Sequence, residues 1–280
     1  MRYILTALLA MAFAVHADNV RVVSDGAGGW LVRTVGGKAM TAAWTPSNII
    51  DDVVAWYDAS DTNTITESAG AVSQWDDKST NANHLVQATG SLQPSTGSRT
   101  INDLNALDFA SDCMNFNSDV NMLGKTIIAV IESDSFASVQ QLFSHQSINV
   151  QFRLHTTGEI RYNALAPYWP SATSSTNTIS VSTPAVVGYL GDTSICFTTD
   201  GVFENSGTGN DGSGSTTINQ IGARASVTDF FNGLFGEVIV VGEIVSTETR
   251  QKVEGYLAWK WGLEDNLPTN HPHKASAPTQ

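Results

Sequence analysis

The sequence predicts an all-β fold, an antiparallel two-sheet sandwich with one short helix near the C-terminus. Three observations predict it: the composition, a series of short apolar runs between turn signals, and a single helical pattern late in the chain. Only 15% of the 280 residues are charged, while Gly, Ser, Thr, Asn and Asp are abundant. That composition is typical of turns and solvated loops between short strands. A chain of this length fits one large β domain.

Short β-prone runs recur along most of the chain. They lie at 53–57, 106–109, 125–132, 140–145, 150–155, 160–164, 185–190, 194–198, 218–221 and 236–241. This spacing indicates a sandwich or a barrel. The runs 126–131 and 238–241 are almost continuously apolar, as expected of inner strands covered on both faces. Asp200 and Gly201 predict a tight hairpin turn.

One helix is predicted near the end of the chain. Ser246 is a candidate N-cap, apolar residues follow at helical spacing up to Trp261, and Gly262 can end the helix. The polar tail 274–280 is expected to be disordered.

The N-terminus has the pattern of a secretory signal over residues 1–17. Arg2 supplies the positive start, 4–15 is an apolar run, and cleavage is expected after Ala17. The run is short for a bilayer core of ~30 Å, which takes roughly 20 apolar residues to cross. We therefore expect an exported protein, secreted or at the cell surface, without a membrane span after processing.

Residues 20–35 alternate apolar and polar positions around the turn-forming stretch 24–29, which predicts a hairpin. Segment 18–45 is therefore interpreted as an N-terminal hairpin or attachment segment, and 46–273 as the main domain. The two cysteines, Cys113 and Cys196, allow a disulfide that closes a long loop or two buried thiols, and both alternatives stay open. Neither lies in a CxxC pair, so a zinc or redox site at sulfur is not expected.

The charge balance bears on the partners of the protein. The sequence has 27 acidic against 14 basic residues, a formal net charge of −13. Such a field repels phosphate backbones and anionic lipid, so nucleic acid is not expected as a partner. The carboxylates offer oxygen ligands to Ca²⁺, which takes several of them, although a solvated acidic surface also explains the balance.

Two pairs of motifs lie near the two ends of the main domain. The first pair reads VAWYDASD at 54–61 and VSQWDDKS at 72–79, and the second reads GLFGEVIV at 233–240 and EGYLAWKWGL at 254–263. Together they resemble the concanavalin A-like, laminin-G-like jelly-roll domains of bacterial surface proteins and of phage and marine viral virion proteins. The resemblance covers about 46–273 and is weak in the middle. It implies two packed antiparallel sheets closed by the last strand and the helix.

A fold of this kind serves lectins, adhesins, glycanases, lyases and virion proteins alike, so function depends on a site. In the family's glucanase branch, two carboxylates project from one face of a strand. Here Glu237 is followed on its face by Ile239 and Val241, so no second carboxylate lines up with it. We interpret Glu237 as a structural tie between the last strand and a neighbour, and no catalytic residue is assigned.

The resemblance places two aspartate-rich loops near each other. Asp58, Asp61 and Asp77 are therefore candidate ligands of a calcium ion. The alternative is that these aspartates cap turns through side-chain hydrogen bonds. The four tryptophans of the motifs are predicted to be core anchors: Trp56, Trp75, Trp259 and Trp261.

Tyr168 and Trp169 follow Pro167 in a stretch without a strand pattern. An exposed aromatic face there could stack on a sugar ring, and the alternative is a ring folded back over the sandwich edge. Asp211, in a Gly-rich stretch, is a further candidate ligand contact.

The function predicted from the sequence is that of a non-catalytic carbohydrate- or surface-binding module, with loops 76–84, 166–175 and 205–217 as its binding rim. Two alternatives stay open. One is a structural or decoration protein of a phage or viral particle. The other is a glycan-degrading enzyme with an atypical site among Asp58, Glu67 and Glu237.

Overall fold

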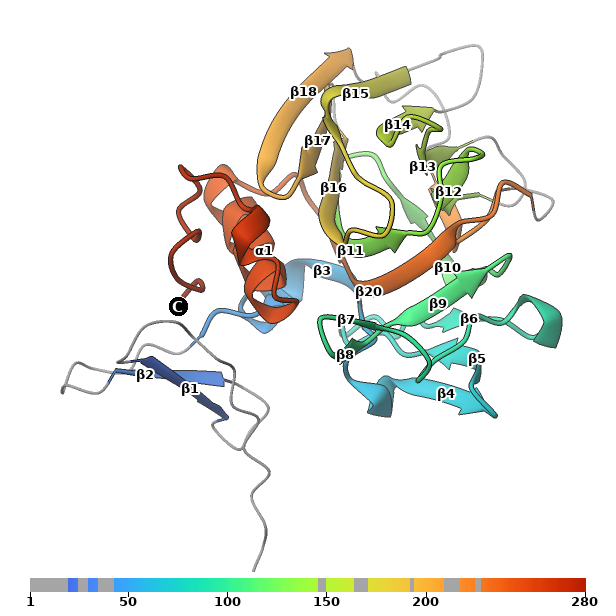
Figure 1. The fold of residues 1–280 in the computed structure, drawn as a ribbon, viewed down its shortest axis with the longest axis horizontal. Coiled ribbons are helices and arrows are strands. Elements are labelled where there is room, and N and C mark those ends of the chain that lie inside the picture. Colours follow the sequence, from blue (N-terminus) through green and yellow to red (C-terminus); the bar gives the residue numbers. More distant parts are fainter. Residues whose placement is uncertain are drawn as a thin grey trace, which may run out of the picture.

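The computed structural model describes residues 20–24, 30–34, 43–145, 150–163, 171–191, 194–208, 217–224 and 228–280. Within these ranges the chain is mostly antiparallel strand, with a single α-helix, α1 (Thr247–Lys260), near the C-terminus (Figure 1). The predicted all-β class with one C-terminal helix is confirmed.

Two large sheets form the body of the molecule. The nine-stranded sheet has the order β15-β14-β13-β12-β19-β10-β6-β5-β4. Its strands are β4 (Ile65–Ser68), β5 (Ala71–Trp75), β6 (Leu85–Val86), β10 (Met114–Asn121), β12 (Gln140–Ser144), β13 (Gln151–Leu154), β14 (Glu159–Asn163), β15 (Ser171–Thr178) and β19 (Thr217–Ile221).

The seven-stranded sheet has the order β18-β17-β16-β11-β20-β3, and β9 pairs with β20 beside β3. Its strands are β3 (Val53–Asp58), β9 (Leu107–Ala110), β11 (Lys125–Ser133), β16 (Ala185–Gly191), β17 (Ser194–Thr199), β18 (Val202–Thr208) and β20 (Asn232–Val241). Most predicted strands correspond to one of these elements within a few residues.

Smaller elements complete the described chain. The predicted N-terminal hairpin is present as β1 (Val20–Ser24) paired with β2 (Trp30–Thr34). The others are β7 (Thr100–Ile101), β8 (Leu104–Asn105) and the 3₁₀ helices η1 (Pro46–Asp52), η2 (Thr62–Thr64), η3 (Gly90–Leu92) and η4 (Glu264–Asn266).

The main core lies between the two sheets and is rich in aromatic rings. It includes Phe109, Phe143, Phe152, Phe197 and Phe235, all fully buried. Neighbouring rings are stacked or edge-on at centroid distances of 5.1–6.1 Å, a range in which aromatic pairs add stability beyond their buried area.

A second core lies on the other face of the seven-stranded sheet, against α1. There Ile128 and Ile239 pack with Leu257 and Trp261. Figure 1 shows α1 beside this sheet and away from β4, β5 and β6. Strands β11 and β20 are therefore covered on both faces, which explains their almost continuous apolar runs.

The tryptophan predictions are confirmed for three of the four side chains. Trp75 and Trp261 are fully buried and Trp56 is nearly so. Trp259 is only partly buried, and its indole N–H donates to the carbonyl of His273 at 2.7 Å.

The helix begins and ends as its capping residues predict. The Ser246 hydroxyl accepts a hydrogen bond from the backbone N–H of Thr249 at 3.1 Å. Gly262, with φ of +66°, provides the left-handed conformation that ends many helices. Within the described residues, no helix combines the length and apolar character that a membrane crossing requires.

The C-terminal tail differs from its prediction. Residues 274–280 were expected to be disordered, but they lie in defined positions. Thr279 pairs with Ala43, and the N–H of Trp44 donates to the carbonyl of Pro278 at 3.0 Å. The ammonium of Lys274 is held by the carbonyls of Glu264 and Asp265. Backbone pairing with the start of the domain thus orders a segment whose composition is polar.

Both cysteines are free thiols, Cys113 buried and Cys196 partly exposed. Of the two alternatives left open by the sequence, the structure therefore has no disulfide. Burial raises the pKa of the Cys113 thiol to about 11, so it stays protonated and unreactive at neutral pH.

Replacing Asp200 by asparagine is expected to stabilise the protein at pH 7. Asp200 lies in the predicted β17–β18 turn with φ of +49°, and its carboxylate accepts from the N–H of Val186 at 2.8 Å. Burial raises its pKa from 3.8 to about 6, so the folded state disfavours the charged form. Asparagine keeps the acceptor and tolerates this backbone conformation.

The raised pKa sets the sign of the pH dependence. The charged Asp200 carboxylate lowers the free energy of unfolding by its full amount above pH 6. This loss of stability disappears as the pH falls toward 4 and the carboxylate becomes protonated in both states. Asp200→Asn should therefore gain about 2 kcal/mol at pH 7 and little at pH 4. Urea unfolding at both pH values measures this, and an equal gain at both would contradict it.

Candidate ligand-binding face

Neighbouring strands of the nine-stranded sheet carry polar side chains in one row. Asn115 of β10 pairs with Gln220 of β19, Gln220 with Ser144 of β12, Ser144 with Gln151 of β13, and Gln151 with Asn163 of β14. Residues directly opposite each other in paired strands point to the same face. We call these five residues the amide row, because four of them are carboxamides.

The amide row lies on the outer face of the sheet. The next residues along the same strands point the other way, into the core between the sheets: Met114, Ile221, Phe143, Phe152 and Tyr162. α1 packs on the seven-stranded sheet, so it does not cover this face. Four strand spacings, ~19 Å in all, separate β10 from β14. The row is therefore a long polar strip on a rigid sheet, and its members Ser144, Gln151 and Gln220 are at most 2% exposed.

A second polar row runs beside the first. Arg153 of β13 pairs with Gln141 of β12 on one side and with Arg161 of β14 on the other. Arg153 Nη1 donates to Gln151 Oε1 at 2.8 Å, which links the two rows. Arg161 is bound to Glu159 at 2.6 Å.

Within the described chain, several acceptors of this face have no hydrogen-bond partner. They are Gln141 Oε1, Gln220 Oε1 and Asn163 Oδ1, each enclosed by surrounding atoms. Gln141 and Gln220 are 0% and 2% exposed as whole residues. A buried polar atom without a partner costs about 1–3 kcal/mol, and native proteins keep few of them. A ligand that donates hydrogen bonds here would meet acceptors that the protein leaves unsatisfied.

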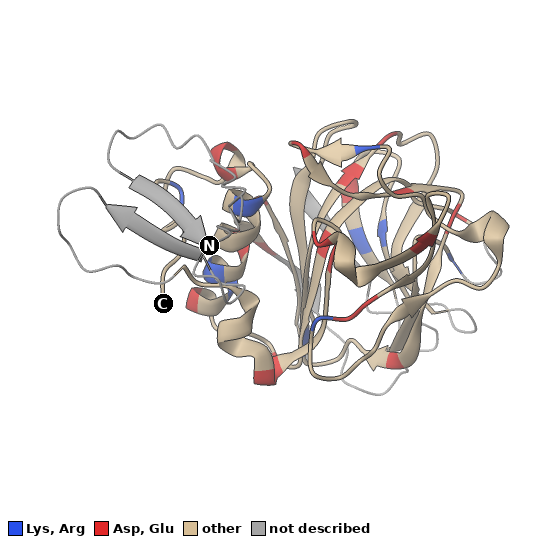
Figure 2. Ribbon diagram, turned by 90° about the horizontal axis from the view of Figure 1, so that it is seen from below, with Lys and Arg blue, Asp and Glu red and all other residues tan. Residues whose placement is uncertain are grey.

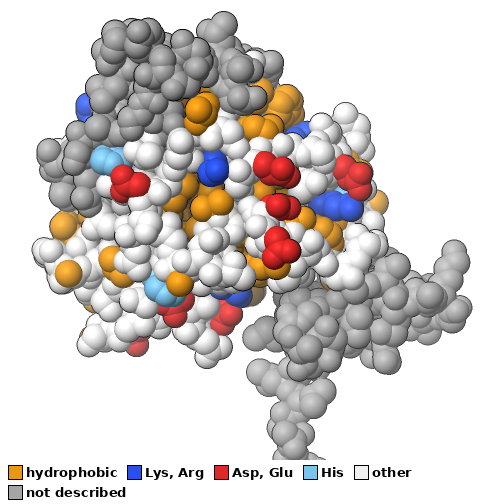
Figure 3. Space-filling model, turned by 180° about the vertical axis from the view of Figure 1, so that it is seen from behind, with side chains coloured by type: hydrophobic (Ala, Val, Ile, Leu, Met, Phe, Trp, Pro, Cys, Tyr) orange, Lys and Arg blue, Asp and Glu red, His pale blue; other side chains and the backbone are white. Residues whose placement is uncertain are grey.

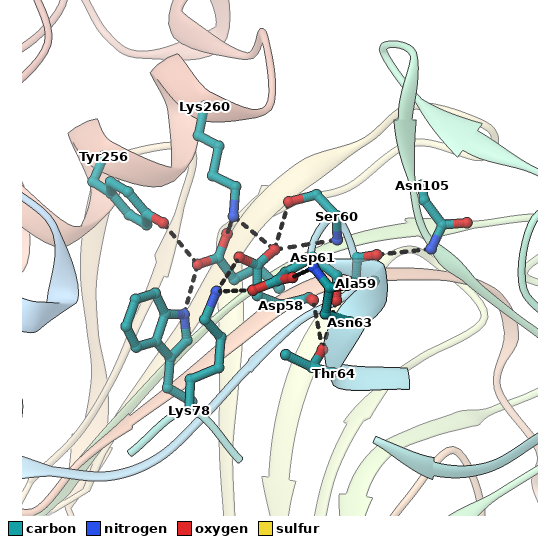
Figure 4. A network of polar contacts seen from close by, with 12 residues as sticks. Asp58, Ala59, Ser60, Asp61, Asn63, Thr64, Lys78, Asn105, Tyr256 and Lys260 are labelled. Carbon is teal, nitrogen blue, oxygen red and sulfur yellow. Dashed lines mark hydrogen bonds and ion pairs between the residues drawn. The ribbon is translucent and has the colours of Figure 1, made fainter. Parts of the chain in front are cut away.

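A charged cluster lies on the face of the seven-stranded sheet that packs against α1, away from the amide row. Lys260 Nζ contacts Asp58 Oδ1 at 2.7 Å and Glu237 Oε2 at 2.6 Å. Lys78 Nζ contacts Asp58 Oδ2 at 3.0 Å and Asp61 Oδ2 at 2.9 Å. Figure 4 shows the two ammonium groups approaching Asp58 from different elements.

The pKa of Asp58 follows from this cluster. Burial raises it, but the ammonium groups of Lys260 and Lys78 outweigh burial and lower the pKa to about 2. Asp58 is therefore a permanent anion that joins β3 to α1 and to the loop after β5. Glu237, opposite Asp58 in the β3–β20 pair, is fully buried and accepts hydrogen bonds from the side chains of Trp56, Tyr256, Lys260 and Trp261.

The residues predicted to bind calcium do not fit that ion as they lie. The Lys78 ammonium occupies the place between Asp58 and Asp61 that a cation would take. The Asp77 carboxylate accepts from the backbone N–H groups of Trp56, Ser79 and Asn83. In the described part of the chain, no group of three or more His, Cys, Asp or Glu could hold a metal ion. The arrangement agrees with the alternative that these aspartates cap turns.

The atypical enzyme site considered from the sequence is not assembled as one cluster of available carboxylates. Asp58 and Glu237 are adjacent, but their oxygens are taken by lysine, indole and phenol donors. The Glu67 carboxylate accepts from the N–H of Gly70 in its own turn, at 2.6 Å.

The predicted ligand contacts Tyr168, Trp169 and Asp211 lie outside the described residues. Of the predicted rim, loop 76–84 is described, and its Asp77 and Asn83 are buried. The Asp77 carboxylate accepts from the N–H of Asn83 within the loop, and Asn83 Oδ1 accepts from the N–H of Ser118 in β10. Residues 171–175 belong to β15 and 205–208 to β18, so these parts of the rim are strand.

The amide row was not predicted from the sequence. Its glutamines and asparagines alternate with apolar residues inside runs that were predicted as strands, such as Gln151 beside Phe152. That alternation signals an outward polar face, but it does not say which strands lie side by side. Asn115 was missed altogether because β10 was not predicted.

The fold and this face define an all-β sandwich domain with a polar outer sheet face. The chain matches no protein-family model and no curated protein. Among solved structures, it is similar to domain 4 of AbnA, an extracellular arabinanase from Geobacillus stearothermophilus, in complex with arabinotriose. That match has a TM-score of 0.52 at 13% identity and covers 70% of this chain and 95% of that one.

Two further solved structures are similar to the same extent. The binding domain of Paraclostridial Mosquitocidal Protein 1 has a TM-score of 0.52 at 12% identity, covering 74% of this chain and 52% of that chain. Trypanosoma rangeli sialidase in complex with sialic acid has a TM-score of 0.52 at 11% identity, covering 86% and 42%. The chain thus spans about half or less of these two proteins. The comparisons establish a shared β-sandwich fold, compatible with a jelly roll.

Proposed function

We propose that the chain is a non-catalytic carbohydrate- or surface-binding module of an exported protein, and that it holds its ligand on the amide row. The observation that carries the proposal is the row itself, with its unpartnered acceptors Gln220 Oε1 and Asn163 Oδ1. The arabinanase domain in complex with arabinotriose and the toxin's binding domain support it by likeness of fold. The resemblance of the motifs to laminin-G-like domains agrees with this proposal.

The chemistry of the row suits a sugar. Each carboxamide both donates and accepts hydrogen bonds, as does each sugar hydroxyl. The side chains stand on β-strands, which hold them in place more firmly than loops do. In the view of Figure 3, uncharged side chains and backbone cover most of the described surface. The carboxamides of the amide row are themselves uncharged, so they do not repel a neutral hydroxylated ligand.

The non-catalytic part of the proposal rests on the buried carboxylates. Glycoside hydrolysis uses a pair of carboxyl groups that flank the scissile bond. The adjacent pair Asp58 and Glu237 faces α1, on the other side of the seven-stranded sheet from the amide row, and is neutralised by Lys260. A sugar on the amide row would therefore not meet these two groups.

Replacing Gln220 by methionine tests the site. Methionine keeps the length of the side chain and removes the amide, so we expect at least tenfold weaker binding on a glycan array. Gln220 Oε1 has no partner, but Gln220 Nε2 donates to Asn115 Oδ1 at 3.2 Å, so losing the whole amide should change the free energy of unfolding by about 1 kcal/mol or less. The matched control is Gln251→Met on α1, which should bind like the wild type. Unchanged binding by Gln220→Met would exclude the amide row as the site.

Two further measurements belong to the same experiment. A chelator is expected to leave binding unchanged, since Lys78 takes the place of a cation at Asp58 and Asp61. Loss of binding on chelation would instead support the calcium site. Release of reducing ends from bound polysaccharides would contradict the non-catalytic proposal.

A further inference from the structure

Arg153 lies on the same face as the amide row, and no carboxylate of the described residues contacts it. Every other arginine whose side chain the structure describes contacts at least one carboxylate. These arginines are Arg99, Arg161, Arg224 and Arg250. The Arg153 side chain is half-buried, and its one hydrogen bond in the described chain is the donation of Nη1 to Gln151 Oε1. A guanidinium removed from water without a counter-ion is costly, so its environment calls for an explanation.

The donors of Arg153 are arranged for a planar anion. Nη1 is occupied by Gln151, and Nε–H is enclosed and has no acceptor among the described residues. The edge formed by Nε and Nη2 has two parallel donors, and a ligand reaches the enclosed Nε–H only where the atoms around it move aside. Such a fork matches the two oxygens of a carboxylate or two oxygens of a sulfate.

The surroundings of Arg153 strengthen its attraction for an anion. Burial lowers the pKa of Arg153, and the nearby positive charges of Arg161 and Arg224 lower it further, while Asp229 acts in the opposite sense. Glu159 and Asp229 lie close by, but each contacts a different arginine, Arg161 at 2.6 Å and Arg224 at 3.4 Å. Among these five described side chains, the three guanidinium groups exceed the two carboxylates by one positive charge.

This local excess contrasts with the rest of the molecule. The whole chain has a formal net charge of −13, and acidic residues are spread over the ribbon in Figure 2. An acidic protein repels acidic polymers through its summed field, so it binds them only where a local group compensates. Arg153 is such a group. It lies directly opposite Gln141 in the β12–β13 pair, and the Oε1 atom of Gln141 has no hydrogen-bond partner among the described residues.

We propose that the face binds anionic glycans, with the carboxylate or sulfate of one sugar on the Nε and Nη2 edge of Arg153 and neighbouring hydroxyls on the amide row. The inference rests on the proposed function, since it names the chemical class of the ligand for the same face. It assigns Arg153 the role of selecting charge, and Gln220, Gln141 and Asn163 the role of binding hydroxyl groups.

Matched polymers test the inference. Binding of the full chain is measured by calorimetry to polygalacturonate and to its methyl ester, which share a backbone and differ in charge, and to dextran sulfate and dextran. We expect polygalacturonate or dextran sulfate to bind at least tenfold more tightly than its neutral counterpart. Whichever of the two binds identifies the anionic group as carboxylate or sulfate.

Variants of Arg153 provide the second arm. Arg153→Met keeps the aliphatic stem and should reduce binding of the anionic polymer at least tenfold. Arg153→Lys keeps the charge but lacks the fork, so it should recover only a small part of the affinity. Lys252→Met, which removes one positive charge from an exposed ion pair on α1, is the control and should bind like the wild type. Thermal unfolding of each variant confirms that it is folded.

The outcomes separate the inference from the proposed function. Equal binding of polygalacturonate and its methyl ester, or full binding by Arg153→Met, would overturn the anionic-glycan inference and leave a neutral glycan-binding face. If no polymer and no glycan of the array binds, both proposals are wrong.

Discussion

Replacing Glu237 by leucine is expected to lower the free energy of unfolding by about 4 kcal/mol. The Glu237 carboxylate is fully buried and accepts from Trp56 Nε1 at 2.7 Å, Tyr256 OH at 3.0 Å, Lys260 Nζ at 2.6 Å and Trp261 Nε1 at 2.9 Å. Leucine would leave all four donors without this acceptor and the ammonium of Lys260 with one carboxylate fewer. Urea unfolding measures the loss.

Two companion variants make this result specific. Glutamine at position 237 keeps the shape but places an NH₂ group against two of the donors, so Glu237→Gln should also lose about 2 kcal/mol. Glu243→Leu alters an exposed glutamate just beyond the end of β20 and should change stability by less than about 0.5 kcal/mol. A Glu237→Leu variant as stable as Glu243→Leu would show that the cluster does not hold β20 to α1.

Replacing Glu254 by leucine is expected to cost about 4 kcal/mol, because it leaves Arg250 as an unpaired buried charge. Glu254 is 0% exposed and binds Arg250 Nη1 at 2.6 Å, the Thr198 hydroxyl at 2.5 Å and His271 Nε2 at 3.2 Å. It thereby joins α1 to β17 and to the C-terminal segment. Chemical unfolding followed by tryptophan fluorescence measures the change.

The same helix contains a matched control. Glu248 and Lys252 form an ion pair with the same four-residue spacing, but the Glu248 side chain is 79% exposed. An exposed pair of this kind contributes about 0.3–0.5 kcal/mol. Glu248→Leu should therefore have a small effect, and equal losses for Glu248→Leu and Glu254→Leu would contradict the role of burial.

Where the pattern was strong and local, the sequence predicted the elements correctly. The helix from Thr247 to Lys260 follows from a cap at Ser246, apolar spacing and a stop at Gly262, all within one stretch of chain. The inner strands β11 and β20 follow from apolar runs that only a doubly covered strand accommodates. The structural role predicted for Glu237 also agrees with its contacts.

Strand β10 was not predicted because its composition is that of a turn. The apolar residues Met114 and Phe116 are buried. The three residues that follow Phe116, namely Asn117, Ser118 and Asp119, favour loops when taken alone. Pairing with β19 and β6 makes this segment a strand. The ordered tail has the same cause, since Thr279 is placed by its pairing with Ala43.

By itself, the sequence determined the all-β class, the position of the helix and the covered strands, because periodicity and capping act between residues close in the chain. The tertiary structure alone decided that Asn115, Gln220 and Gln151 form one row, and that Lys78 lies between Asp58 and Asp61. It also decided that, among the described residues, the carboxylates near Arg153 contact other arginines and none contacts Arg153 itself. These arrangements depend on which distant strands pair, and long-range packing, not the local pattern of any one strand, selects those partners.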